Sequence, residues 1–95
     1  MPVTHFRVRW PDQRETLCYS PSSVVSEHLE AGAAYPLPVF LDRARSALNQ
    51  ASERVRRRYG FACSAAQDQL DVIEATAARF AGQAGATVTV LAFER

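Results

Sequence analysis

A chain of 95 residues allows a single domain, residues 1–95, because a core of this size buries too little surface to be divided into two. The formal charge of +1 and the hydrophobic fraction of 47% are ordinary for a folded protein. They exclude disorder and a general affinity for polyanions.

The first ten residues contain no apolar run of signal-peptide length, and no stretch approaches the roughly 20 apolar residues that span a membrane. We therefore expect a cytoplasmic protein without a membrane partner. The two cysteines, Cys18 and Cys63, lie far apart, without a CxxC spacing or a neighbouring histidine. Free, buried thiols are the expected state, and no metal site or cofactor is indicated.

A hairpin is the first predicted structure. Residues 4–10 alternate large apolar side chains with His5, Arg7 and Arg9, which is the period of a half-buried strand. Residues 15–19 return as the second strand. One face of the hairpin is therefore apolar and the other is basic.

The turn decides which side chains of the second strand share each face. With Asp12 and Gln13 as a two-residue loop, Arg7 lies opposite Cys18, while Leu17 and Tyr19 join the apolar face. The basic residues and Cys18 would then form a small cationic patch. If no helix covers it, this patch could bind an anionic ligand or a second copy of the chain; an ordinary exposed sheet face is the competing interpretation.

A short helix over residues 24–29 is favoured after the hairpin, because a serine cap and Pro21 precede it and Gly32 can end it. A β extension remains open for this segment. Residues 31–38, with one glycine and two prolines, are predicted to be a loop.

Two long amphipathic helices follow. The first starts near Pro38 or Val39, and Gly60 suits the left-handed position that ends it. Its core-facing stripe, at spacings of three and four, is Phe40, Ala44, Ala47, Leu48, Ala51, Val55 and Tyr59. The second helix begins at Ser64, and its Gln69 falls inside the apolar arc, where it needs a polar partner if buried.

Residues 87–93 form a β-branched strand whose direction relative to the first strand is left open. Strict alternation places Leu91 and Phe93 on its outer side. Joined to the hairpin, the strand predicts an α+β domain with a three-stranded sheet, covered on one face by the two long helices and with a short helix after the hairpin.

An arginine run near the end of the first long helix is the strongest functional signal. Arg54, Arg57 and Arg58, with Tyr59 and Phe61, form a second candidate binding surface. At about 100° per residue the charges spread around the helix, so a solvated helix end is the competing interpretation. A nucleic-acid-binding regulator is an alternative, although nucleic acid is the less favoured partner.

Catalytic motifs are absent: the sequence has no GxSxG, HExxH, Walker A or dinucleotide fingerprint. Nothing places a base beside Cys18 or Cys63, so no catalytic residue is assigned. An interaction role is favoured over an enzyme, with a small ligand-binding protein as a further alternative.

Four motifs occur in order along the chain: Arg9-Trp10-Pro11-Asp12, Cys18-Tyr19-Ser20-Pro21-Ser22, Ala51-Ser52-Glu53-Arg54-Val55-Arg56 and Tyr59-Gly60-Phe61. Together they make a sequence that resembles, over nearly its whole length, small bacterial nitrogen starvation response proteins encoded in nitrilase gene clusters. In this family the hairpin turn usually reads Asp-Gly, where this chain has Asp12-Gln13.

The resemblance implies a context, nitrile or cyanide assimilation during nitrogen starvation, and no catalytic residue. We expect a non-catalytic accessory protein that binds an enzyme of the same cluster, or a second copy of itself, through the open sheet face or the arginine-rich helix end.

Overall fold

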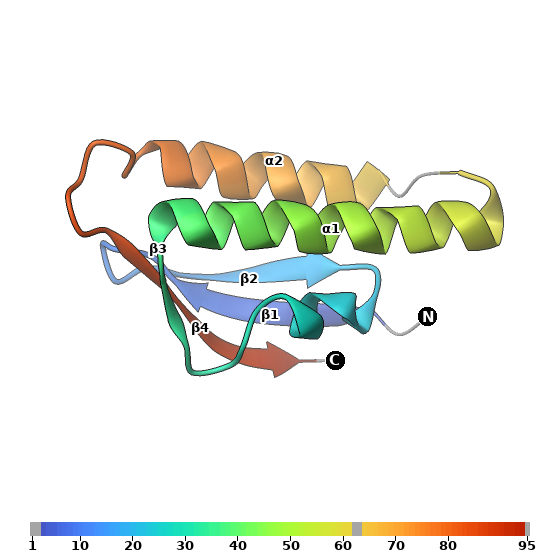
Figure 1. Ribbon diagram of the computed structural model, residues 1–95, viewed down its shortest axis with the longest axis horizontal. Coiled ribbons are helices and arrows are strands. Elements are labelled where there is room, and N and C mark those ends of the chain that lie inside the picture. Colours follow the sequence, from blue (N-terminus) through green and yellow to red (C-terminus); the bar gives the residue numbers. More distant parts are fainter. Residues whose placement is uncertain (1–2, 62–63, 95) are drawn as a thin grey trace.

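The computed structural model describes residues 3–61 and 64–94. A four-stranded antiparallel sheet of order β2-β1-β4-β3 lies against two long helices, and both helices cover the same face (Figure 1). In chain order the elements are β1 (Thr4–Arg9), β2 (Glu15–Ser20), the 3-10 helix η1 (Ser23–Glu27), β3 (Ala34–Pro36), α1 (Leu37–Tyr59), α2 (Ser64–Ala78) and β4 (Thr87–Glu94). The α+β class and the two covering helices agree with the sequence-based prediction.

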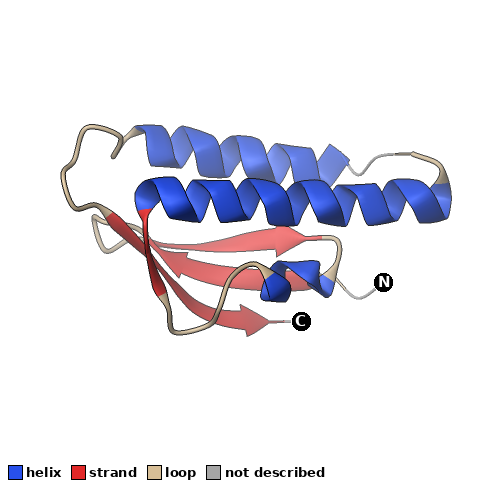
Figure 2. Cartoon of the chain, viewed as in Figure 1, coloured by secondary structure: helices blue, strands red, loops and turns tan. Residues whose placement is uncertain are grey.

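The predicted three-stranded sheet is wrong, because the segment predicted to be a loop contributes the fourth strand. β3 has only three residues and pairs with β4 at the sheet edge, with Ala34 opposite Thr89 (Figure 2). So short a strand has no detectable alternation, and Pro36 is acceptable there because an edge strand does not need every N–H group. β4 runs antiparallel to β1, which answers the question of its direction.

The hairpin turn has three residues instead of two. The backbone N–H of Trp10 donates to the carbonyl of Arg14 at 2.8 Å, and that of Gln13 donates to the carbonyl of Trp10 at 2.9 Å. Gln13 has a φ of 72°, in the left-handed region. This is the common three-residue loop, in which a tight turn is followed by one left-handed residue.

The extra loop residue shifts the strand register by one. Phe6 faces Cys18, and Arg7 faces Leu17. The predicted pairing of Arg7 with Cys18 is therefore wrong, and the outer and inner residues of β2 are exchanged, because a one-residue slip turns every side chain to the other face.

A bulge changes the faces of β4 in the same way. Val8 pairs with Val90 and Arg7 pairs with Ala92, so Leu91 is the additional residue between them. Phe93 consequently lies opposite Phe6 and packs against the core, not on the outer side where alternation placed it.

The short helix after the hairpin is confirmed as η1, in place of a β extension, and the Ser22 hydroxyl caps it by accepting from the N–H of Val24 at 3.3 Å. The long helix ends as predicted, since Gly60 has a φ of 83° and its N–H donates to the carbonyl of Arg56 at 2.8 Å.

Gln69 of α2 has the polar partner that the sequence required. Its side-chain carbonyl accepts from the backbone N–H of Tyr19 at 2.9 Å. β2 is an edge strand, so this bond satisfies an amide that no neighbouring strand can reach and fixes α2 over that edge.

Candidate functional site

The sheet face opposite the helices carries three of the predicted site residues. His5, Arg7 and Arg9 follow one another on the outer side of β1, each half-buried. The guanidinium groups do not make a cationic patch, because each meets a carboxylate: Arg7 lies 3.3 Å from Glu94 and Arg9 lies 3.5 Å from Glu15. The face is close to electrically neutral.

Apolar side chains fill the space beside these ion pairs. Leu17 is 45% exposed. Tyr19 is half-buried and meets the His5 ring edge-on, with ring centroids 5.9 Å apart. Leu91 and Ala92 are the half-buried outer residues of β4 at the bulge. We call these residues, with the two ion pairs, the open sheet face.

Cys18 does not belong to this face, contrary to the prediction. It lies on the helix-covered side with an exposed fraction of 0%, as a free thiol. Burial raises the pKa of the Cys18 thiol from 9.0 to about 12, so the thiol stays protonated at neutral pH and is a poor nucleophile. Cys63 lies outside the described residues.

The C-terminal end of α1 continues past the core. Ala51 is its last fully buried residue, Val55 is half-buried, and Tyr59 is 56% exposed. The predicted core position of Tyr59 is therefore wrong, because α1 extends beyond the sheet that its apolar stripe covers (Figure 1). Phe61, just after the helix, is 66% exposed.

The arginines at this helix end are only partly neutralised. Arg56 and Arg57 both approach Glu53, at 2.6 and 3.6 Å, and the hydrogen bond from Arg56 is the largest cause of the lowered pKa of Glu53. Arg54 lies 3.8 Å from Glu27 of η1. With Arg58, this end of the molecule has four arginines near two glutamates. The charges lie on several sides of the helix.

Tyr59 contacts both Arg58 and Phe61, so these three side chains form one cluster. The Arg58 guanidinium lies 5.8 Å from the centroid of the Tyr59 ring, and the Tyr59 and Phe61 centroids are 6.4 Å apart. Tyrosine and arginine are enriched where proteins bind one another tightly. We call Arg54, Arg57, Arg58, Tyr59 and Phe61 the helix-end surface; Arg58, Tyr59 and Phe61 contact one another in sequence, while Arg54 approaches Glu27 and Arg57 approaches Glu53.

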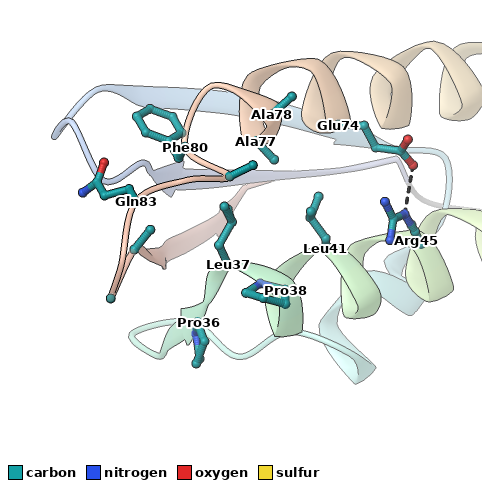
Figure 3. A pocket seen from close by; sticks show the side chains of 13 residues that line it. Pro36, Leu37, Pro38, Leu41, Arg45, Glu74, Ala77, Ala78, Phe80 and Gln83 are labelled. Carbon is teal, nitrogen blue, oxygen red and sulfur yellow. Dashed lines mark hydrogen bonds and ion pairs between the residues drawn. The ribbon is translucent and has the colours of Figure 1, made fainter.

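Sequence reasoning missed a cavity of about 540 Å³ at the opposite end of the helix pair. It lies between the start of α1, the end of α2 and residues 79–86 (Figure 3). Its walls are mainly apolar, and they come from Leu37, Leu41, Ala77, Ala78, Phe80 and Ala86. No sequence motif indicates this cavity; the only related signal in the sequence is the run of small residues at the end of α2.

Within residues 3–61 and 64–94, no group of three or more histidine, cysteine, aspartate or glutamate side chains is placed to hold a metal ion. In the same part of the chain, no helix is both long and apolar enough to cross a membrane.

The fold and its surfaces define a small α+β protein, with two helices on one face of an antiparallel sheet, an exposed aromatic pair at one end of α1 and a cavity at the other. The model of a family described as nitrogen starvation-induced protein NitG matches residues 5–93. The chain belongs to this family, which confirms the resemblance to nitrogen starvation proteins. Searches of curated proteins and of solved structures found no match.

Proposed function

We propose that this nitrogen starvation-induced protein is a non-catalytic cytoplasmic accessory protein that binds a partner protein through its helix-end surface. The exposed pair Tyr59 and Phe61 carries the proposal. Burying a side chain of this size contributes about 1.5 to 3 kcal/mol, so leaving both in water forgoes stabilisation that a partner can supply. Gly60, in the left-handed conformation that ends α1, lies between the two rings.

The charges around the aromatic pair indicate the chemistry of the partner. Since four arginines meet two glutamates here, a complementary surface has an apolar pocket rimmed by aspartate and glutamate. We propose an enzyme encoded in the same nitrilase gene cluster as this partner.

Nucleic acid fits the same surface less well. Glu53 lies among the arginines and would repel phosphates. A nucleic-acid complex would instead show an affinity that falls steeply with salt.

The test is binding between the purified chain and each purified enzyme of the cluster. We expect Tyr59→Ala and Phe61→Ala each to weaken binding by about tenfold or more, as truncation of a central aromatic residue does. Val72→Ala is the matched control, because Val72 is an exposed apolar residue, 53% accessible, on α2.

Two results would contradict the proposal. One is that no cluster enzyme binds. The other is that an enzyme binds and neither aromatic truncation affects its affinity, which would move the contact to another surface.

A further inference from the structure

We propose that the cavity between α1 and α2 is a binding site for a small organic anion that has an apolar body and a carboxylate group. The site is separate from the helix-end surface: Leu41 and Tyr59 are 18 residues apart on α1, about 27 Å at 1.5 Å per residue. A ligand there would give the protein a second binding activity, independent of its proposed partner.

The apolar part of the site suits a small molecule in size and lining. A volume of about 540 Å³ lies within the range of known ligand pockets, roughly 300 to 1,000 Å³. Leu37 and Leu41 of α1 form one wall, and Ala77 and Phe80 form the other (Figure 3). The exposed Ala78 is too short to close the mouth.

The apolar walls of this space are in contact with water, because its mouth is open. An apolar ligand would remove that surface from water, at about 25 cal/mol for each Å² of apolar area. Larger residues on α2 would fill the space.

Arg45 and Glu74 provide the polar end of the cavity. The Arg45 guanidinium donates through Nε to a Glu74 carboxylate oxygen at 3.0 Å, and both side chains line the pocket. Among the described residues this is the guanidinium's one recorded contact, so its two terminal nitrogens point their donors elsewhere. One N–H from each terminal nitrogen can donate to one of the two oxygens of a carboxylate.

The local charge favours an anion over a cation. The guanidinium of Arg79 lies 5.8 Å from the centroid of the Phe80 ring, which lines the cavity. A second guanidinium therefore lies beside one of the residues that line the cavity, although it does not line the cavity itself. Glu74 is already engaged with Arg45, and holding that guanidinium in place is its role in the site.

The experiment is a titration of the full chain followed by amide NMR, with 3-phenylpropanoate as the anionic probe. Its neutral and cationic counterparts, 3-phenylpropanol and 3-phenylpropylamine, have the same apolar body. We expect the carboxylate to bind with a Kd of about 1 mM or tighter, the order that a ligand of this size supports. Shifts should concentrate in residues 36–45 and 74–86, and the alcohol and the amine should bind more weakly.

Two variants separate the parts of the site. Arg45→Gln should weaken carboxylate binding about tenfold and leave the alcohol unchanged. Ala78→Leu should fill the mouth and abolish binding of every probe. Ala75→Leu is its control, because Ala75 is also exposed on α2 but does not line the cavity.

The absence of shifts at concentrations well above the expected Kd overturns the site. Equal binding of carboxylate and alcohol, or an unchanged affinity in Arg45→Gln, overturns the assignment of an anion. Circular dichroism of each variant shows that the fold is retained, and because Ala78 and Arg45 lie partly in solvent, neither change disturbs the packed core.

Discussion

Cys18 shows at the scale of one residue how the packing decides chemistry. Its side chain faces Phe6 beneath the helices, where a thiolate would have neither water nor a cation to stabilise it. A thiol in that setting serves as a small core residue. Mechanisms that need a reactive thiol at this position are disfavoured by the burial itself.

The same burial predicts how stability depends on pH. Because the pKa of Cys18 is raised from 9.0 to about 12, the folded state holds the thiol proton more tightly than the unfolded state. This stabilisation is fully present below about pH 9 and is lost as the pH rises towards 12, at up to about 1.4 kcal/mol per pH unit.

Urea unfolding at about pH 8 and about pH 10.5 measures this loss. The variant Cys18→Ala should be less stable at the lower pH, because it leaves a small cavity, yet it should lose less stability at the higher pH. Other groups titrate equally in both proteins. Parallel losses in the two proteins would show that Cys18 does not contribute.

Residue-level prediction from sequence failed where a single backbone angle mattered. The alternation in β1 correctly placed His5, Arg7 and Arg9 on one face. Which side chains of β2 face the helices depends on Gln13, because its left-handed conformation sets the length of the turn. A glutamine does not indicate that conformation in the sequence. A glycine at this position would have indicated the positive φ, although the length of the loop would still have been ambiguous.

At the scale of elements, the link between α2 and the edge of β2 depends on one side-chain bond. Gln69 accepts from the N–H of Tyr19, so Gln69→Leu removes the acceptor while keeping a side chain of similar size. We expect a loss of about 1 kcal/mol in the free energy of unfolding, since a half-buried amide loses its partner and water replaces it only in part. Hydrogen exchange of the Tyr19 amide should become faster.

Gln67→Leu is the control for this change. Gln67 is exposed on the same helix, and its bond to Asp71 at 3.0 Å is a surface interaction worth a few tenths of a kcal/mol. Equal destabilisation by the two changes would contradict a specific role for the bond to Tyr19.

Long elements were predictable and short irregular ones were not. Both helices follow from apolar spacings repeated over several turns, and the stop at Gly60 follows from its conformational freedom. β3 is too short to have a pattern, and the bulge at Leu91 arises from pairing with β1, not from the sequence of β4 alone. For the same reason the inward position of Phe93 was not predictable.

At the scale of the whole molecule, two features depend on how several elements meet. α1 is longer than the surface that it covers, so its last turns leave the core and expose Tyr59, although the apolar spacing continues without a break. At its other end, the cavity depends on how α1, α2 and residues 79–86 meet. Neither feature is a property of one segment. The sequence indicated the arginine and aromatic residues at the helix end, but it did not indicate the cavity.

The open sheet face leads to a prediction about the assembled state. Its two arginines and two glutamates balance, so two copies can meet there without net repulsion, and each Arg7–Glu94 or Arg9–Glu15 pair can exchange partners across a two-fold axis. The exposed Leu17, beside Tyr19, supplies apolar area for the contact. We propose a homodimer through this face, leaving both ends of α1 free.

Light scattering during size-exclusion chromatography measures the assembly. We expect a mass of twice the 10.5 kDa of one chain, and a single-chain mass for Leu17→Glu, because two added carboxylates would be brought together in the interface. Val72→Glu is the matched control, since it places the same charge on α2 and should leave the dimer intact. A wild-type chain that has the mass of one copy at high concentration contradicts the dimer. A dimer that survives Leu17→Glu but is broken by Val72→Glu places the contact on the helices, so that α2 of one copy meets α2 of the other.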